Sequence, residues 1–174
     1  MIELKPGEKG AVEAQPSGKP RMGGMMGPKG KRRMARILIV EDQEGTRELL
    51  EFAVRKLLPK YFEEGSKYDV AKWYAQAEEL IRKNRYDIVI LDHRMPRTDP
   101  GCTDASDFNR FSATLQNIGY GLIDLIRETN PSAVIIGTSS LNPDELRHTP
   151  KPDYLITKSW GEAGQDLEKI FKNI

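Results

Sequence analysis

The sequence predicts an α/β protein with a doubly wound, five-stranded parallel sheet and helices on both faces. Short runs of branched apolar residues alternate along the chain with segments whose apolar residues recur at helical spacing. Five such strand and helix units in series imply right-handed crossovers, which put helices on both faces of one sheet. The chain has 174 residues, 38% of them apolar, which is enough to bury one core of ordinary size.

The predicted strands are mostly continuous apolar runs, the pattern of strands covered on both faces. They span residues 37–40, 69–73, 87–91, 133–137 and 154–157. Between them we expect helices over 44–58, 76–83 and 121–128, and a short one over 141–147 that opens at Asn142-Pro143. Pro59 is expected to end the first helix. A final helix puts Ala163, Leu167, Ile170, Phe171 and Ile174 on one face, which should dock on the sheet.

Polar residues follow four of these strands directly. They are Glu41 and Asp42, Asp92, Thr138 and Ser139, and Lys158. Ligands of parallel sheets bind outside the carboxyl ends of the strands, so these side chains are expected to converge on one crevice. Three carboxylates, a hydroxyl and an ammonium form a set suited to a metal ion and a phosphate group.

Each signature taken alone has a simpler explanation. An acidic pair can be a favourable charge at a helix N-terminus. Asp92 can form a turn, Thr138 and Ser139 can cap a helix, and Lys158 can be a solvated lysine. A binding site is favoured because all four groups of polar residues occur together, each at the end of a predicted strand. His93 is expected to flank it, because magnesium prefers oxygen ligands.

These segments resemble the receiver domain of bacterial two-component response regulators. The motifs are Ile-Leu-Ile-Val-Glu-Asp at 37–42, Ile-Leu-Asp-His-Arg-Met-Pro at 90–96, Ile-Ile-Gly-Thr-Ser at 135–139 and Ile-Thr-Lys at 156–158. The resemblance covers residues 34–174 and implies a flavodoxin-like fold, a phosphorylatable Asp92 and a bound Mg²⁺. It further implies that Mg²⁺ is held by Glu41 through water, Asp42, Asp92 and the backbone carbonyl of Arg94, and the phosphoryl group by Thr138, the Ser139 amide and Lys158.

The function that follows from this resemblance is a stand-alone receiver. We expect Asp92 to accept a phosphoryl group from a histidine kinase or phosphotransfer protein, and the chain to signal by docking on a downstream protein or by phosphorelay. Beyond catalysing its own aspartyl phosphorylation and dephosphorylation, no classical enzyme activity is expected. Because the sequence stops at Ile174, just after the last predicted helix, no output domain is expected either.

Two rival functions remain to be weighed. One is a pseudo-receiver that is never phosphorylated and acts as a protein–protein docking module. The other is a magnesium-dependent phosphatase of another α/β family, which would need a second catalytic acid two residues after the nucleophile. Arg94 stands at that position, which argues against the phosphatase.

Residues 97–120 depart from the receiver pattern, which usually has only a few residues at this point. A polar connection of this length is often a lid or a partner surface. We hypothesise that it controls the lifetime of an aspartyl phosphate, with Asp104, Ser106, Asp107 and Arg110 near the phosphoryl group. The alternative is a solvated loop with a helical turn over 108–115.

The last strand also departs from the pattern. Receivers commonly have an aromatic residue three positions before the lysine, but Leu155 stands there and Tyr154 comes one residue earlier. Ser159 replaces the usual proline after the lysine, and the predicted fourth helix is short. We therefore expect phosphorylation to be coupled to the output surface by another route, or weakly.

Residues 1–33 form a basic segment rich in Gly, Lys and Met, which we predict to be disordered. It has no aromatic residue to stack on bases, so nucleic-acid binding is not expected. Met34 is an alternative start of translation. No apolar run approaches the ~18 residues that span a bilayer, and no signal-peptide core is present, so we expect a cytoplasmic protein without a membrane partner. A single cysteine, Cys102, excludes an internal disulfide.

Overall fold

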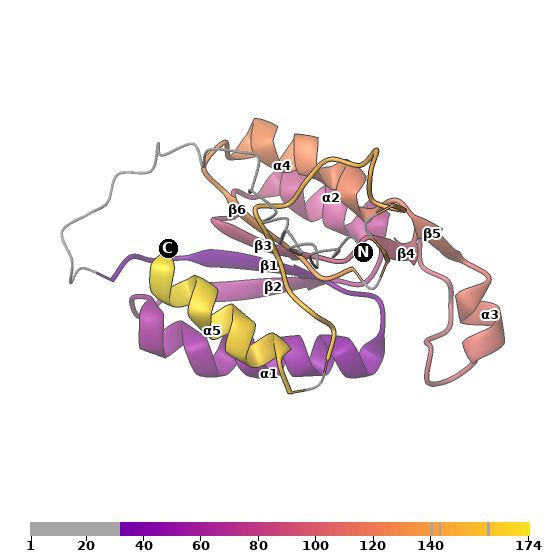
Figure 1. The fold of residues 1–174 in the computed structure, drawn as a ribbon, viewed down its shortest axis with the longest axis horizontal. Helices are drawn as coiled ribbons and strands as arrows, with labels where there is room; N and C mark the ends of the chain where they lie inside the picture. Colours follow the sequence, from indigo (N-terminus) through magenta and orange to yellow (C-terminus); the bar gives the residue numbers. More distant parts are fainter. Residues whose placement is uncertain (1–31, 140, 143, 160) are drawn as a thin grey trace, which may run out of the picture.

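The structure is a computed structural model that describes residues 32–139, 141–142, 144–159 and 161–174. Its main sheet has five parallel strands in the order β2-β1-β3-β6-β7. The strands are β1 (Arg36–Val40), β2 (Lys67–Ala71), β3 (Ile88–Leu91), β6 (Val134–Gly137) and β7 (Tyr154–Leu155). Figure 1 shows the sheet edge-on between two layers of helices, which confirms the predicted doubly wound α/β fold.

Alternating side chains of the central strands build two cores, one on each side of the sheet. Leu38 of β1 and Val89 of β3 face the core under α2 (Tyr74–Lys83) and α4 (Leu122–Thr129). Ile39 and Ile90 face the other, under α1 (Glu44–Tyr61) and α5 (Ala163–Asn173). All four of these side chains are fully buried, as the continuous apolar runs predict. The two layers lie above and below the sheet in Figure 1.

The first helix is longer than predicted. It continues through Pro59 to Tyr61, so the expectation that Pro59 ends it is wrong. Pro59 lies in the last turn, where the missing N–H removes one backbone bond, while the amide of Phe62 still donates to the Leu58 carbonyl at 2.9 Å. Phe62 then packs edge-on against Phe171 of α5, with ring centroids 5.3 Å apart, which holds the end of α1 in place.

The second strand begins and ends two residues earlier than predicted. Its register with β1 pairs Arg36 with Lys67 and Val40 with Ala71, and Trp73 then takes the N-cap position of α2. Glu41 N donates to the Ala71 carbonyl at 3.1 Å, so the pairing closes there. The predicted boundaries are wrong because the polar residues that begin β2 lie at a half-buried edge of the sheet, where the apolar pattern is weak.

The region before β7 differs most from the prediction. Residues 144–148 form turns, and no helix occurs among the described residues of 141–153; Pro143, the expected helix opener, lies outside them. The strand that follows is only Tyr154–Leu155, shorter than the predicted 154–157. One hydrogen bond, from Ile156 N to the Gly137 carbonyl at 2.9 Å, continues the pairing beyond it.

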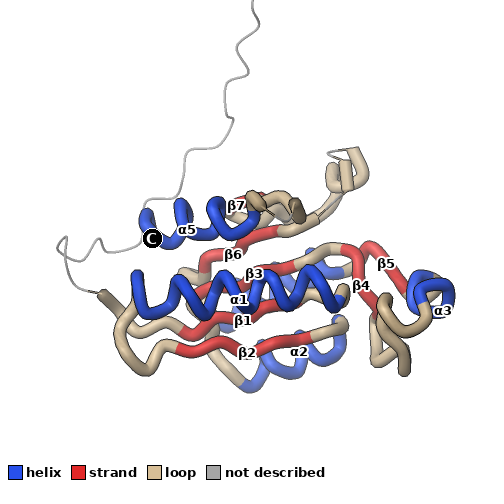
Figure 2. Tube along the Cα trace, turned by 90° about the horizontal axis from the view of Figure 1, so that it is seen from below, coloured by secondary structure: helices blue, strands red, loops and turns tan. Residues whose placement is uncertain are grey.

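The long connection after β3 is folded. It contains β4 (Arg94–Pro96), α3 (Phe108–Ser112), β5 (Leu115–Asn117) and the 3₁₀ turn η1 (Gly119–Gly121), and β4 pairs antiparallel with β5. We call residues 94–121 the excursion. Both views show it projecting beyond the carboxyl ends of the strands, with α3 farthest from the sheet (Figures 1 and 2). The predicted helical turn is present as α3, whereas the two-stranded stem was not foreseen.

Nearly all of the predicted basic tail lies outside the described residues. At its end, Arg32 donates to the Pro59 carbonyl and the Arg33 carbonyl accepts from Glu63 N. In the described ranges, none of the helices has the length and apolar character required to cross a membrane.

Candidate functional site

The register of the sheet brings the predicted site residues side by side. Val40 pairs with Leu91, and Leu91 pairs with Gly137, so the three strands end level with one another. The ladder runs one residue further, because Asp92 N donates to the Val40 carbonyl and Thr138 N to the Leu91 carbonyl, both at 3.0 Å. Glu41, Asp92 and Thr138 are therefore neighbours at the carboxyl edge, as predicted for parallel strands.

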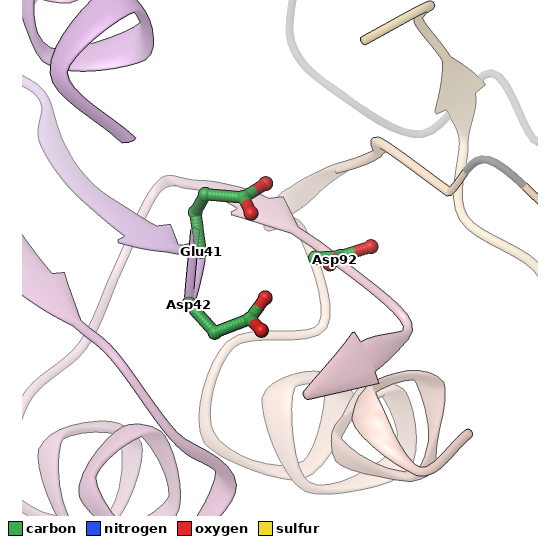
Figure 3. A group of neighbouring side chains, drawn as sticks. All are labelled: Glu41, Asp42 and Asp92. Atoms are coloured by element: carbon green, nitrogen blue, oxygen red, sulfur yellow. The ribbon is translucent and has the colours of Figure 1, made fainter. Parts of the chain in front are cut away.

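Glu41, Asp42 and Asp92 form a compact carboxylate cluster. One carboxylate oxygen from each lies within 4.8 Å of the others, and all three residues are buried. In Figure 3, Glu41 and Asp42 follow the end of β1, and both carboxylates point to the side on which Asp92 lies. A group of three buried carboxylates repels itself unless cations or protons are present.

Lys158 supplies one of these cations. Its Nζ lies 2.7 Å from Asp92 Oδ2 and 3.2 Å from Glu41 Oε2, and its side chain is only 16% exposed. The amide of His93 donates to the other Asp92 oxygen, Oδ1, at 2.7 Å. The Asp92 carboxylate is thus fixed on both sides, and one ammonium faces three carboxylates.

The electrostatics of the cluster show that this balance is incomplete. Burial, followed by repulsion from Asp92, raises the pKa of Glu41 to about 8 and that of Asp42 to about 7. Burial alone would lower the pKa of Lys158, but attraction to Asp92 and Glu41 outweighs it, so this pKa is raised and the side chain remains an ammonium. The site holds a surplus of negative charge that a further cation would neutralise.

Unpartnered polar atoms indicate where such a cation fits. Both carboxylate oxygens of Asp42 are buried and accept no hydrogen bond from the described part of the chain. Carboxylate oxygens are the ligands that Mg²⁺ prefers, and two or three suffice because the ion keeps several waters. The cluster therefore fits the predicted magnesium ion. Arg94, whose carbonyl was predicted as a further ligand, begins β4 opposite Asn117 with its side chain exposed.

Thr138 and Ser139 lie on the opposite flank of Asp92 from β1. Thr138 is 1% exposed, and its Oγ1 has no hydrogen-bond partner among the described residues. The Ser139 hydroxyl is engaged locally, since it accepts from Leu141 N at 3.1 Å. A buried hydroxyl without a partner is costly, and an incoming anion would satisfy it.

The excursion residues predicted to approach the phosphoryl group lie differently. Asp104 reaches only the rim, where its Oδ1 accepts from Glu44 N at 3.0 Å and caps the start of α1. Ser106, Asp107 and Arg110 are exposed. Asp107 caps α3 by accepting from Arg110 N, and Ser106 bonds to Thr103. Their hydrogen bonds are local, and α3 lies far from the sheet (Figures 1 and 2), so the structure does not bring these three residues to Asp92 as predicted.

Sequence reasoning missed two residues that close the site from the excursion side. Gly119 lies so close to Asp92 that an added Cβ would sit 1.9 Å from the Asp92 carbonyl oxygen. Tyr120 is 1% exposed, and its ring packs on His93 with centroids 4.5 Å apart. The only sequence signal was the Gly-Tyr-Gly triplet at the end of the polar stretch, where glycine often marks a close approach of backbone segments.

Solved structures with the same architecture include receiver domains and response regulators. The receiver domain of a sensor histidine kinase from Pseudomonas aeruginosa PAO1, solved with a magnesium ion in its active-site cleft, matches with a TM-score of 0.56 and 19% identity, over 80% of this chain and 96% of that one. A response regulator from Thermotoga maritima in complex with Mg²⁺-BeF matches with a TM-score of 0.54 and 24% identity, over 80% and 98%.

A response regulator receiver domain protein from Methanospirillum hungatei, described as CheY-like, matches with a TM-score of 0.51 and 19% identity, over 80% of this chain and 92% of that one. No protein-family model and no curated protein matches the chain. At these identities the likeness concerns the fold, and it confirms the fold predicted from the sequence. The chain has the fold of response regulator receiver domains.

Proposed function

We propose that this chain is a single-domain receiver of two-component signal transduction in the cytoplasm. In this proposal Asp92 accepts a phosphoryl group from a histidine kinase or phosphotransfer protein in a Mg²⁺-dependent reaction. The modified chain then signals by docking on a downstream protein or by passing the group on.

One observation supports the proposal above all others. A buried carboxylate, Asp92, is held between a lysine ammonium at 2.7 Å and a backbone amide at 2.7 Å, beside the carboxylates of Glu41 and Asp42. A structural ion pair would need one acid and one base. Two additional buried acids call for further positive charge at the site, which a bound cation would supply.

The residues have separate roles in this reaction. An Asp92 oxygen forms a bond to phosphorus while the bond between phosphorus and the donor nitrogen breaks, and the electron pair stays on the donor. Glu41, Asp42 and Asp92 would hold Mg²⁺, which when bound offsets the repulsion between the carboxylate and the phosphoryl oxygens. Lys158, the Thr138 hydroxyl and the Ser139 amide would donate to those oxygens.

A pseudo-receiver is the second candidate, and the outer edge of the sheet favours it. Tyr154 and Leu155 are 40% and 64% exposed, and the described residues of 141–153 contain no helix to cover them. A docking module could use that apolar edge without any phosphorylation. Such a module would, however, have no use for two unpartnered Asp42 oxygens.

The two functions are separated by the intact mass of the protein after incubation with MgCl₂ and acetyl phosphate. A receiver gains the mass of one phosphoryl group, and both Asp92→Asn and removal of Mg²⁺ abolish the gain. Asp104→Asn is the matched control, because this acid lies at the rim and caps α1. Its phosphoryl uptake should equal that of the wild type.

A folded wild type that binds Mg²⁺ but gains no mass would favour the pseudo-receiver. Binding of beryllium fluoride, which mimics the phosphoryl group, reveals whether an adduct formed and hydrolysed too fast to be weighed. If the mimic also fails to bind, the proposed function is wrong.

A further inference from the structure

The hydroxyl of Tyr120 is the buried polar group that the proposed reaction does not use. Tyr120 is 1% exposed, and its OH has no hydrogen-bond partner among the described residues. A desolvated hydroxyl without a partner raises the free energy of the conformation that contains it. Phenylalanine would fill the same space without this cost.

Close packing fixes the position of the hydroxyl next to the last residue of β6. A Cβ added to Gly137 would lie 2.3 Å from the Tyr120 oxygen, so the phenol occupies the space that a side chain at 137 would take. The next two residues along the chain are Thr138 and Ser139, which supply the phosphoryl-binding hydroxyl and amide in the proposed function. Tyr120 thus touches the start of the turn that would close on the phosphoryl group.

The electrostatics agree with this location. Burial, followed by the Asp92 charge, raises the pKa of Tyr120 to about 12, against the opposing effects of the Ser139 amide and Lys158. The phenol therefore lies within the field of the site. The Ser139 amide is the backbone group that acts on the phenol, although no hydrogen bond of ordinary geometry joins the two.

The backbone of Tyr120 is tied to the other side of the site. Tyr120 N donates to His93 Nδ1 at 3.1 Å, and Gly119 N donates to the His93 carbonyl at 2.8 Å. The ring also stacks on the His93 imidazole. Tyr120 consequently bridges the residue after Asp92 and the residue before Thr138.

We propose that Tyr120 is a positioning residue whose hydroxyl finds its hydrogen-bond partner on the 138–139 turn only when that turn closes on the phosphoryl group at Asp92. This inference rests on the proposed function. The missing bond disfavours the resting conformation relative to the closed one, so the hydroxyl strengthens phosphoryl binding without touching the group. Because Tyr120 ends the excursion, the closed turn also holds the excursion against the site.

The test measures two quantities on Tyr120→Phe: the stability to urea of the Mg²⁺-free protein, and the affinity for beryllium fluoride in the presence of Mg²⁺. Removing an unpartnered hydroxyl should leave the resting protein as stable as the wild type, or more stable. Affinity for the mimic should fall by about three- to tenfold, the range of one ordinary hydrogen bond.

Tyr86→Phe is the matched control. Tyr86 is also buried, at 2% exposure, but its hydroxyl donates to Asp69 Oδ2 at 2.8 Å, and it belongs to the loop that enters β3, at the amino end of the sheet. Its loss should lower the stability and leave the affinity for the mimic unchanged.

The contrary result is a Tyr120→Phe protein that behaves as Tyr86→Phe does, with lower stability and unchanged affinity for the mimic. In that case the hydroxyl is an ordinary group of the core, and the role of Tyr120 is wrong while the receiver function stands. A wild type that neither binds the mimic nor takes up a phosphoryl group overturns both.

Discussion

The inner and outer parts of the sheet differ sharply in how they are built. At the centre, β3 is buried along its whole length, and its end is level with those of β1 and β6, where Glu41, Asp92 and Thr138 meet. At the outer edge, β7 has two residues, both exposed, and turns precede it where a helix was expected. Lys158 is the one site residue contributed from the outer part.

In the proposed function, this difference separates two requirements of the protein. The chemistry depends on side chains held in fixed positions, which buried and hydrogen-bonded strands provide. Recognition of a partner depends on the exposed surface, which can change without disturbing the strands. The centre carries the carboxylates and the Thr138 hydroxyl of the proposed phosphoryl transfer, and only Lys158 comes from the outer part. The outer edge and the excursion are where this chain departs from the receiver pattern.

The largest loss of stability is expected from removing the Lys158 ammonium, the cation that the outer part of the sheet contributes to the carboxylate cluster. Lys158→Met leaves three buried carboxylates without their ammonium, and breaking a buried ion pair typically costs about 3–5 kcal/mol. We expect a loss of this size in urea unfolding of the Mg²⁺-free protein at pH 8, together with loss of phosphoryl uptake. Lys169→Met, which removes an exposed ion pair with Asp166, should change the stability by less than about 1 kcal/mol.

Equal losses in the two lysine variants would show that Lys158 forms no more than a surface pair.

Next in size is the contact between the excursion and the centre. In Gly119→Ala the new Cβ would lie 1.9 Å from the Asp92 carbonyl oxygen, so the backbone must shift. We expect a loss of about 2–3 kcal/mol and slower phosphoryl uptake. Gly164→Ala is the control: its Cβ would meet Ala53 at 3.8 Å within α5, where alanine is expected to stabilise the helix by about 0.5 kcal/mol.

If Gly119→Ala had the stability and the phosphoryl uptake of the wild type, the close contact between the excursion and Asp92 would be of no consequence for the site.

A smaller effect links pH to magnesium. The pKa values of Glu41 and Asp42 are raised to about 8 and 7, so the folded state holds protons that the unfolded state has already lost. The free energy of unfolding of the Mg²⁺-free protein should therefore fall as the pH rises from about 5 to 8. Asp42→Asn should flatten this slope.

Mg²⁺ competes with those protons for the carboxylates. The increase in the free energy of unfolding on Mg²⁺ binding should therefore be greater at pH 8 than at pH 5.5. With the ion at about ten times its Kd, the gain is about 1.4 kcal/mol. Thermal unfolding with and without MgCl₂ at the two pH values measures it. Equal gains at both values would contradict a shared site for protons and metal.

The smallest effect is expected at the outer edge. Leu155 is 64% exposed, so Leu155→Ser should change the stability by less than about 0.5 kcal/mol and leave phosphoryl uptake unaltered. At the centre, the milder change Ile90→Val removes one fully buried methyl group and should cost about 1 kcal/mol. If Leu155→Ser proved the more damaging, β7 would be part of the core.

The central strands and the site residues at their ends could be predicted from sequence because their signal is local. Continuous apolar runs identify buried parallel strands, and parallel topology then brings their ends together. Asp92 and Lys158, 66 positions apart in the chain, meet for this reason alone. What the sequence could not supply was the resulting charge surplus, which depends on burial.

The peripheral elements could not be predicted because tertiary contacts decide them. The β4–β5 stem has three residues in each strand, too few to give an apolar pattern. Pro59 is tolerated because Phe62 still bonds to Leu58 and packs on Phe171. Tyr120 escaped notice because nothing in a polar stretch reveals that one tyrosine is buried against Gly137.

The central claim is that Asp92 is the phosphoacceptor, and locating the modification tests it most directly. The protein would be incubated with MgCl₂ and acetyl phosphate, digested, and its peptides analysed by tandem mass spectrometry. The account predicts a phosphoryl group on the peptide that contains Asp92 and on no other. A phosphoryl group found on a different residue, or an unmodified Asp92 in a protein that binds Mg²⁺, would contradict it.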